Sequence, residues 1–300
     1  MTKISIVIPY WNGAEKIQRY LPDVLKFART NNVEEVIASD DSSTDDTVQL
    51  LKNEFPDVVV IEREHNEGFS SNVNTGFSKA KGDFVFLINS DAMPGEAVFK
   101  YAMPHFDDKR VFSVGCNTGG LWAIGGFKNG FFWHDQARKA GPCEATVHQT
   151  LWVSGGSGVF RKSMWDKMGG LDELYNPFYV EDLDLGYRAT KRGYINIWEP
   201  KSKVDHYTEK GVIESNFSRD KINYTAERNM LIFIWKNITN EKLISDHKLA
   251  LTKRLFSHPK YWLVFLAALR QYPAIMRKRE IEKQEAKLSD EEIFGIFEGV

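Results

Sequence analysis

The first third of the chain alternates between short apolar runs and segments with a helical spacing of apolar residues. The apolar runs are ISIVIPY, EEVIAS, DVVVIE and DFVFLI. In the last run, Phe84 to Ile88 are five consecutive apolar residues, which is typical of a strand buried on both faces. Between the runs, apolar residues recur with a helical period, as at Ile17, Leu21, Leu25 and Ala28. Strands that alternate with helices in this way predict a doubly wound, mostly parallel α/β sheet.

The character of the sequence changes twice further along the chain. Glycine and tryptophan concentrate from about Val111 to Tyr207, and after Ser218 the apolar spacing is helical to the end. We therefore predict one α/β domain over residues 1–217, followed by a helical C-terminal region over residues 218–300.

Charge and composition exclude several classes of protein. The net charge of −2 provides no basic face of the kind that binds nucleic acid. Cys116 and Cys143 match no metal-binding spacing and predict a reduced chain. The first apolar run is too short for a signal peptide, and no apolar stretch approaches the roughly 20 residues that span a bilayer. These features together predict a cytoplasmic protein.

Acidic residues follow two of the predicted strands. Asp91 comes shortly after the strand Phe84 to Ile88, and Asp40 and Asp41 follow the run EEVIAS. Open α/β sheets bind their ligands at the carboxyl ends of strands. The glycine-rich loops G-x-G-x-x-G and G-x-x-x-x-G-K-[ST] are absent from the sequence. Adjacent like charges repel each other, so we expect one of Asp40 and Asp41 to accept a hydrogen bond from the ring N–H of a base.

Five segments carry a resemblance to a known family: ISIVIPYWN, SDDSSTDDT, NEGFSSNVNTGFSKAKGDFVFLINSDA, GGLDELYNPFYVEDLDLGYRATKRGY and VDHY. They stand in the order seen in family 2 glycosyltransferases of the GT-A fold, and they look most similar to its rhamnosyltransferase and galactofuranosyltransferase-like branch. The resemblance covers roughly residues 4–235. It implies a GT-A type, Rossmann-like sheet with a nucleotide-binding half over residues 1–110 and a sugar or acceptor half over residues 111–217.

The resemblance also assigns residues to a nucleotide pocket. The residues implied are Pro9, Tyr10, Asn12, Asp41, Asn66, Asn74 and Ser90. Among them Asp41 is expected to accept a hydrogen bond from the base, while Asn66 and Asn74 are expected to close the opposite wall.

The segment NSD stands where the family carries its D-x-D metal motif. Asn89 replaces the first aspartate, so Asp91 is the expected metal ligand, and the resemblance adds His206 as a second. A nucleoside diphosphate would be repelled by a lone carboxylate, and a divalent ion such as Mg²⁺ or Mn²⁺ removes that conflict. Such an ion would stabilise the departing diphosphate as a Lewis acid. The alternative is that Asp91 only caps the end of its strand.

An acidic cluster at the start of a predicted helix suggests acid–base chemistry. Asp184 and Arg188 are spaced for an ion pair, which we expect on the surface. Asp182 lies in the first turn, where the helix dipole should keep it ionised and able to act as a general base. In the resembled family the aspartate of the Glu181–Asp182 pair has that role, with Glu181 facing the sugar or acceptor. The alternative is a charge cluster without chemistry.

A glycine-rich turn precedes this helix. The segment VSGGSGVFR lacks the last glycine of a G-x-S-x-G nucleophile elbow, because Val159 stands there. The resemblance instead places Gly155 and Gly156 beside the donor sugar, where backbone N–H groups can approach closely. Trp152 could stack on an acceptor sugar or belong to the core.

The C-terminal region contains the apolar run YWLVFLAAL, residues 261–269, with several Lys and Arg residues on each side. Such a segment fits a helix in the membrane interface, with its cations toward anionic lipid at the inner face of the membrane. It fits equally well a helix that packs on the catalytic domain or on a second subunit of a homodimer. Both interpretations stay open.

The residues and the resemblance together predict an inverting, metal-dependent hexosyltransferase. It would move a sugar from a dTDP-, UDP- or GDP-linked donor to a saccharide or lipid-linked saccharide in cell-surface glycan synthesis. A sugar-1-phosphate nucleotidylyltransferase is an alternative, but it would need a basic, glycine-rich loop where PYWNGAEK stands. A non-catalytic module that binds sugar nucleotides is another, but it would need no base.

Overall fold

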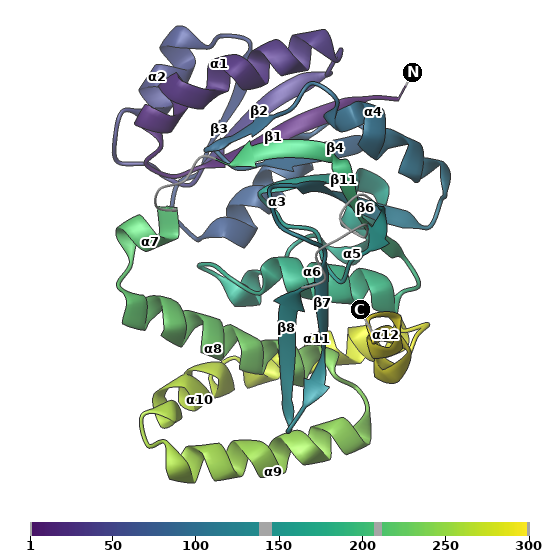
Figure 1. Ribbon diagram of the computed structural model, residues 1–300. Coiled ribbons are helices and arrows are strands. Elements are labelled where there is room, and N and C mark those ends of the chain that lie inside the picture. The colour runs from purple at the N-terminus through teal and green to yellow at the C-terminus, as the bar shows by residue number, and fades with distance from the viewer. Residues whose placement is uncertain (1, 138–145, 207–211, 299–300) are drawn as a thin grey trace.

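The computed structural model of the protein describes residues 2–137, 146–206 and 212–298. Its centre is a nine-stranded sheet in the order β3-β2-β1-β4-β10-β6-β11-β5, with β9 paired to β11 (Figure 1). Strands β7 and β8 form a separate hairpin. The strands are β1 (Ile4–Tyr10), β2 (Glu35–Asp40), β3 (Val58–Glu62), β4 (Phe84–Ile88), β5 (Ala92–Pro94), β6 (Val111–Asn117), β7 (Ala123–Lys128), β8 (Phe131–Gln136), β9 (His148–Gln149), β10 (Ser157–Arg161) and β11 (Ile195–His206).

Helices cover both faces of the sheet because successive residues of a buried strand point to opposite sides. In β1, Ile6 and Ile8 belong to the core shared with α1 (Ala14–Thr30), α2 (Thr47–Glu54) and α4 (Val98–Ala102). Val7 belongs to the core on the opposite face, shared with α3 (Phe69–Lys79), α5 (Lys162–Met168) and α6 (Glu181–Lys191). The prediction of a doubly wound α/β sheet is confirmed.

The sheet is mostly parallel with three exceptions, β5, β9 and β10, and of these the two-residue strand β9 runs antiparallel to β11. β1 pairs in parallel with β2 and β4, and β2 with β3. β10 runs antiparallel between β4 and β6, and β5 runs antiparallel to β11. Strand β5 comes from the first predicted half of the domain and β11 from the second, so residues 1–110 and 111–217 contribute to a single sheet.

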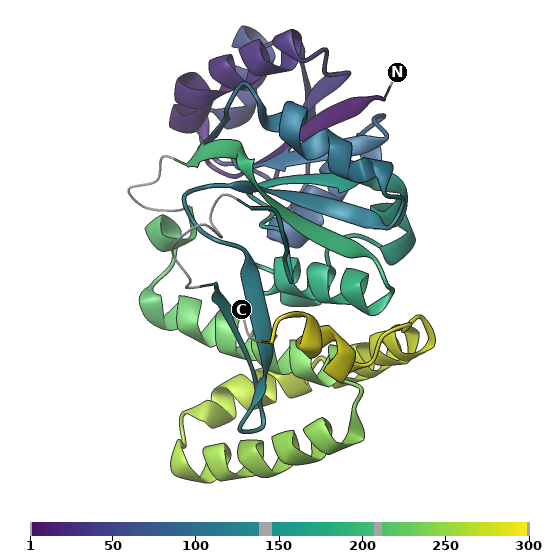
Figure 2. The ribbon, with the colours of Figure 1, turned by 45° about the vertical axis from the view of Figure 1, so that its right-hand side comes forward.

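The described residues after β11, 212–298, form helices and the turns between them, as predicted. Phe233 of α8 packs against Phe132 of the hairpin and Tyr187 of α6, with ring centroids 4.7 and 5.2 Å away. The C-terminal helices therefore share a core with the hairpin, which runs down beside them (Figure 2). The domain boundary near residue 217 stays a prediction. The helices are α7 (Val212–Asn216), α8 (Arg219–Asn237), α9 (Glu241–Ser257), α10 (Tyr261–Leu269), α11 (Tyr272–Gln284) and α12 (Asp290–Ile296).

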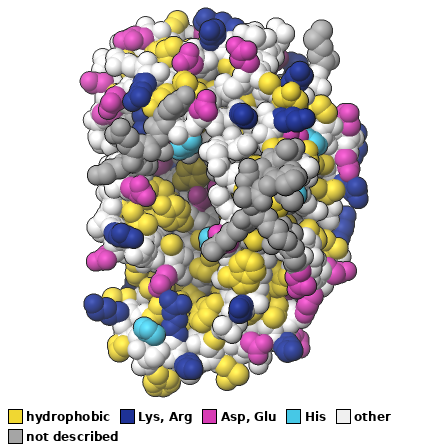
Figure 3. Space-filling model, viewed as in Figure 1, with side chains coloured by type: hydrophobic (Ala, Val, Ile, Leu, Met, Phe, Trp, Pro, Cys, Tyr) yellow, Lys and Arg dark blue, Asp and Glu magenta, His cyan; other side chains and the backbone are white. Residues whose placement is uncertain are grey.

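Helix α10 corresponds to the apolar run of the C-terminal region, and only one of its faces is packed. Tyr261, Val264 and Ala268 are buried, whereas Leu263 is 65% exposed. Hydrophobic side chains are visible between Lys and Arg at the lower end of the molecule, where α9 and α10 lie (Figure 3). Within the described ranges, no helix has the length and hydropathy needed to cross a bilayer.

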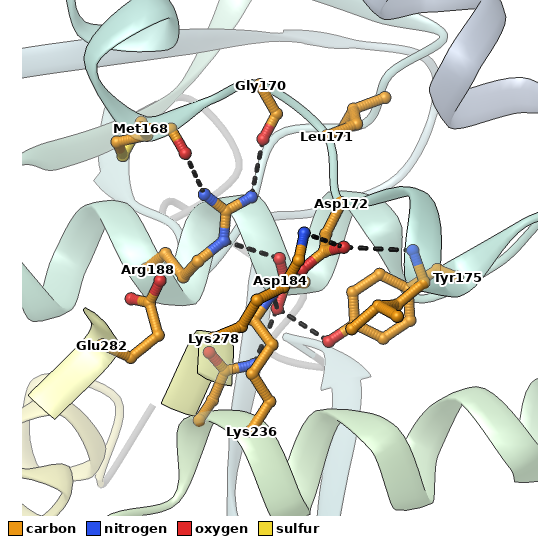
Figure 4. Close-up of polar contacts among 12 residues, drawn as sticks. Met168, Gly170, Leu171, Asp172, Tyr175, Asp184, Arg188, Lys236, Lys278 and Glu282 are labelled. Carbon is orange, nitrogen blue, oxygen red and sulfur yellow. Dashed lines mark hydrogen bonds and ion pairs between the residues drawn. The ribbon is translucent and has the colours of Figure 1, made fainter. Parts of the chain in front are cut away.

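Asp184 and Arg188 form the ion pair that their spacing predicts, but the pair is buried rather than on the surface. Arg188 Nε lies 2.6 Å from Asp184 Oδ2, and neither residue is more than 3% exposed. Lys236 of α8 lies 2.8 Å from Asp184 and 2.5 Å from Asp172, so it bridges two carboxylates (Figure 4). The prediction of a surface pair was wrong because α8 covers this face of α6, which the spacing within α6 cannot reveal.

Candidate active site

A cavity of about 390 Å³ opens at the carboxyl ends of β1, β2 and β4. Because these strands are parallel, their carboxyl ends meet at one edge of the sheet. The segment before α6, the end of β11 and helix α7 complete the wall. The lining residues include Pro9, Tyr10, Trp11, Asp41, Asn66, Gly68, Phe69, Asn72, Asn89, Ser90, Asp91, Tyr179, His206 and Phe217.

Asp41 organises one wall of this cavity. Its Oδ1 accepts hydrogen bonds from Arg63 Nη1 at 2.6 Å and from the backbone N–H of Glu67 at 3.2 Å. Its Oδ2 accepts from the backbone N–H of Gly68 at 2.8 Å. With its side-chain amide oriented to satisfy both neighbours, Asn66 donates to Oδ2 at 3.1 Å and accepts from Trp11 Nε1 at 2.8 Å.

These contacts fill the acceptor positions of the Asp41 carboxylate, which has about four lone-pair sites. Burial raises the pKa of Asp41, although the N–H donors of Gly68 and Glu67 and the charge of Arg63 counteract it. A base that bonds to Asp41 must therefore replace one of the present donors. Asp40 differs, because it accepts from the backbone N–H of Ser43 at 2.8 Å and holds the turn after β2.

Asp91 lies at the centre of a second group of polar side chains. Lys16 Nζ of α1 is 2.6 Å from Asp91 Oδ2, and His206 Nε2 is 3.3 Å from Asp91 Oδ1. The register of β5 and β11 explains the second contact, since it pairs His206 with Ala92, the neighbour of Asp91. Asn89 Nδ2 lies 3.5 Å from His206 Nε2. The structure thus brings together the two predicted metal ligands and adds a cation, Lys16.

The positions of Asp91 and His206 fit a divalent ion. Two ligands of one octahedral ion, each about 2.1 Å from it, are about 3 Å apart, close to the 3.3 Å between Asp91 Oδ1 and His206 Nε2. In the part of the chain that the structure describes, no group of three or more His, Cys, Asp or Glu side chains is placed to hold a metal. Other ligands would have to come from a bound diphosphate and water, which is how Mg²⁺ is commonly held in nucleotide sites.

The carboxylates of Glu181 and Asp182 stand at the first turn of α6. Asp182 Oδ2 accepts a hydrogen bond from the backbone N–H of Gly155 at 2.9 Å. Burial raises the pKa of Asp182 to about 6, against the lowering effect of that hydrogen bond. We expected the helix dipole to keep Asp182 ionised, and the burial that acts against ionisation could not be seen in the sequence. At neutral pH the carboxylate is still the major form.

Glu181 is buried more deeply than Asp182. Burial and then the charge of Asp182 raise the pKa of Glu181 well above its usual range. Its Oε2 has no hydrogen-bond partner among the described residues. Both effects favour the protonated form of Glu181.

The glycine turn connects Asp182 to the cavity. A Cβ on Gly155 would lie 2.7 Å from Asp182 Oδ1 and 3.2 Å from the ring of Phe69, and a Cβ on Gly156 would lie 2.6 Å from Asn89 Nδ2. Phe69 and Asn89 both line the cavity. The absence of side chains at Gly155 and Gly156 thus allows α6 to approach the end of β4.

Seven predicted site residues are not among those that line the cavity: Asn12, Asn74, Trp152, Gly155, Gly156, Glu181 and Asp182. The last four lie at the glycine turn and the start of α6, next to the cavity wall. Asn12 Oδ1 accepts from the backbone N–H of Thr44 at 2.8 Å and joins the loops after β1 and β2. Asn74 exchanges hydrogen bonds with the backbone of Leu171 at 2.8 and 3.0 Å, and Asn72, half a turn earlier on α3, lines the cavity instead. Trp152 borders a separate cavity of about 80 Å³, and its acceptor role stays a prediction.

Sequence reasoning missed two cations of the site. Lys16 lies in the first turn of α1, directly after the segment PYWNG, and Arg63 follows β3. Both could have been found by asking which cations balance Asp91 and Asp41, since buried carboxylates are usually paired. An aromatic wall was also missed. It is built by Trp11, Phe178 and Phe217, with ring centroids 6.1 Å apart for Trp11 and Phe217 and 4.9 Å for Phe178 and Phe217.

Comparison with known proteins places this geometry among sugar-transferring enzymes. The family model described as glycosyl transferase family 2 matches residues 5–164. The poly(ribitol-phosphate) beta-glucosyltransferase of Bacillus spizizenii is 35% identical over 104 residues, which cover 33% of this chain but only 16% of that protein. The N-acetylglucosaminyl-diphospho-decaprenol L-rhamnosyltransferase of Mycobacterium tuberculosis is 25% identical over 239 residues, which cover 68% of this chain and 76% of that protein.

Solved structures support the fold. Residues 1–349 of TarS from S. aureus align with a TM-score of 0.56 at 14% identity, covering 99% of this chain and 90% of that one. GalNAc-T7, solved with UDP, GalNAc and Mn²⁺, aligns with a TM-score of 0.64 at 14% identity, covering 87% of this chain and 57% of that one. At such identities the similarity shows a shared GT-A type architecture.

Proposed function

This chain belongs to glycosyl transferase family 2, and we propose that it transfers a sugar from a nucleoside diphosphate donor to a saccharide or lipid-linked saccharide. One observation supports the proposal: Asp91 lines the cavity, and Asp182, from a distant part of the chain, lies next to its wall. A Cβ on Gly155 would be 2.7 Å from Asp182 Oδ1 and 3.2 Å from the ring of Phe69, which lines the cavity. The family assignment removes the nucleotidylyltransferase alternative. Retention of Asp182 opposes a module that only binds sugar nucleotides, since binding needs no base.

We assign the nucleoside to the wall formed by Asp41, Asn66 and the aromatic residues Trp11 and Phe217. A planar base fits beside aromatic rings, and the polar groups of this wall can recognise its edge. The relatives' names support donors and acceptors of this kind, since one acts on a diphospho-decaprenol-linked sugar and another on poly(ribitol-phosphate).

The diphosphate is assigned to the group around Asp91. Lys16 offers an ammonium ion at this position and would pair with a phosphate oxygen once the diphosphate enters. Asp91 and His206 would hold a Mg²⁺ or Mn²⁺ ion, which would supply Lewis-acid stabilisation of the departing diphosphate. GalNAc-T7 and a mannosyltransferase of Pyrobaculum calidifontis, both of this fold, were solved with Mn²⁺, which supports the choice of ion.

Asp182 is assigned as the general base. The acceptor hydroxyl gives its proton to the Asp182 carboxylate while its oxygen forms the new bond to the anomeric carbon, and the bond from that carbon to the diphosphate oxygen breaks. This single displacement inverts the anomeric configuration. Burial and the charge of Asp182 raise the pKa of the neighbouring Glu181, which favours its protonated form, a poor nucleophile for a covalent intermediate.

A thermal-shift screen with UDP, dTDP and GDP, each with Mn²⁺ or with a chelator, tests the donor site. A nucleotide at 100 times its dissociation constant stabilises by about 2.7 kcal/mol, so the correct one should raise the melting temperature clearly. Asp91→Ala should remove the Mn²⁺-dependent part of the shift, and His206→Ala should reduce it. Equal shifts with Mn²⁺ and with chelator would contradict the metal assignment, and no shift with any nucleotide would contradict the donor assignment.

A further inference from the structure

The exposed side of α9 and α10 carries an unusual concentration of large apolar side chains. Phe256 is 82% exposed, Leu263 65%, Leu266 44%, Trp262 43% and Leu269 41%. On α10 these residues recur at a helical spacing, so they share one face of the helix. We call this set of five residues the apolar face.

The opposite side of α10 is packed against the protein, and this packing fixes the direction in which the apolar face points. Tyr261, Val264 and Ala268 are each less than 9% exposed and belong to the core that also contains α8. Arg254 stacks on the ring of Tyr261 at 4.1 Å, and its Nη2 contacts Glu227 of α8 at 3.0 Å. The helix is therefore held in place with its apolar face outward.

The segment that carries the apolar face is rich in Lys and Arg and contains no Asp or Glu. Between His247 and Arg279 the sequence contains eight Lys and Arg residues and no Asp or Glu, in a chain whose net charge is −2. Among the described residues, Arg254 and Lys278 form ion pairs, and Arg279 donates to the backbone carbonyls of Trp235 and Ile238. The other five cations have no ion pair and are exposed: Lys248, Lys253, Lys260, Arg270 and Arg277. The region therefore combines exposed apolar surface with uncompensated positive charge.

We propose that the apolar face, with the cations around it, binds the surface of an anionic lipid bilayer. Leu, Phe and Trp side chains would enter the boundary between headgroups and acyl chains, while Lys and Arg would contact lipid phosphates. A second copy of this chain is the less favourable occupant. A two-fold interface through this face would bring the same cations together, and like charges across an interface oppose association.

The position of the surface has a consequence for the reaction. Phe217 of the nucleotide wall lies two residues before the start of α8, and α8 is the helix on which α10 packs. Docking through the apolar face would thus hold the catalytic cavity at a set place above the membrane. This last step rests on the proposed function, because it matters only if the acceptor is carried on a lipid.

Co-sedimentation of the full chain with vesicles tests the proposal. We expect binding to vesicles of phosphatidylcholine mixed with phosphatidylglycerol, weaker binding to phosphatidylcholine alone, and weaker binding at high salt because the cations are screened. Leu263→Glu combined with Leu266→Glu should reduce binding at least about tenfold, since two apolar insertions are lost. Val59→Glu is the matched control, because Val59 is 42% exposed but lies on β3, far from this face in the sequence.

A second variant tests the contribution of the cations separately from that of the apolar side chains. Lys260→Ala combined with Arg270→Ala should weaken binding to the anionic vesicles only. Wild-type protein that stays in the supernatant, or control and test variants that bind alike, would overturn the proposal. A dimer in sedimentation velocity that the Leu263→Glu and Leu266→Glu substitutions dissociate, without any vesicle binding, would assign the face to a second copy. No donor or acceptor is present in these measurements, so their failure leaves the transferase assignment standing.

Discussion

At the scale of single residues, the site depends on carboxylates that the fold places in different surroundings. Asp41 is surrounded by N–H donors, Asp91 faces Lys16 and His206, and Asp182 is half-buried with one backbone donor. The three residues are all aspartates, but their surroundings differ, and each is assigned a different role. Two predictions follow from Asp41 and Asp182.

Asp41→Asn should weaken nucleoside diphosphate binding by about 1–3 kcal/mol. The substitution removes the negative charge that accepts hydrogen bonds from Arg63 and from the backbone N–H of Gly68. The hydrogen bonds that hold this wall of the cavity in place therefore become weaker. Calorimetry with the nucleotide from the thermal-shift screen measures the change. Asp57→Asn is the control, because Asp57 pairs with Arg29 at the surface, and an equal loss for both variants would remove Asp41 from the site.

The rate of transfer should rise with pH through an apparent pKa of about 6. The base form of Asp182 is deprotonated, and burial raises its pKa to about 6, so the active form is lost as pH falls below that value. The same shift means that ionising Asp182 costs stability, so its contribution to folding becomes less favourable as pH rises through 6. A pH profile of kcat/KM between pH 5 and 8 shows the effect, and a rate that is flat across this range would argue against Asp182.

At the scale of elements, helix α6 joins the site to the C-terminal helices. Its first turn carries Glu181, Asp182 and also Asp184, which is bound by Arg188 and by Lys236 of α8 (Figure 4). Burial opposes the ionisation of Asp184, but Arg188 and Lys236 outweigh it and lower its pKa. The C-terminal helices thus help to hold the catalytic helix in place.

Lys236→Met should destabilise the fold by about 3–5 kcal/mol, because it leaves Asp172 and Asp184 buried beside one cation fewer. Thermal or urea unfolding measures the loss. Lys283→Met is the control, since Lys283 pairs with Glu280 at the surface, where such pairs contribute at most about 1 kcal/mol. Similar unfolding curves for the two variants would show that the buried pair does not stabilise the junction.

At the scale of the whole molecule, the sequence was most informative where a residue's role depends on its own strand or helix. The apolar run from Phe84 to Ile88 correctly predicts a fully buried strand, β4. Asp41 and Asp91 were predicted at strand ends, and the structure places both in the cavity wall. Neither inference requires knowledge of the rest of the fold.

Features that depend on a neighbouring element could not be predicted in the same way. The burial of Asp184 depends on α8, and the approach of Lys16 to Asp91 depends on how α1 crosses the sheet. The helical spacing of α10 did not decide whether this helix packs on the protein or is exposed. In the structure one face of α10 is packed and the opposite face is exposed. Cys116 is buried, and Cys143 lies outside the described residues.

The most direct test of the central claim compares Asp182→Asn with the wild type in donor binding and in turnover. The asparagine keeps the shape of the side chain but cannot take the proton, so turnover should fall by about 10²–10⁴-fold. The dissociation constant of the donor nucleotide should stay the same, since the nucleotide is assigned to Asp41 and Asp91. Near-normal turnover in Asp182→Asn, or a product that retains the donor's anomeric configuration, would contradict the mechanism.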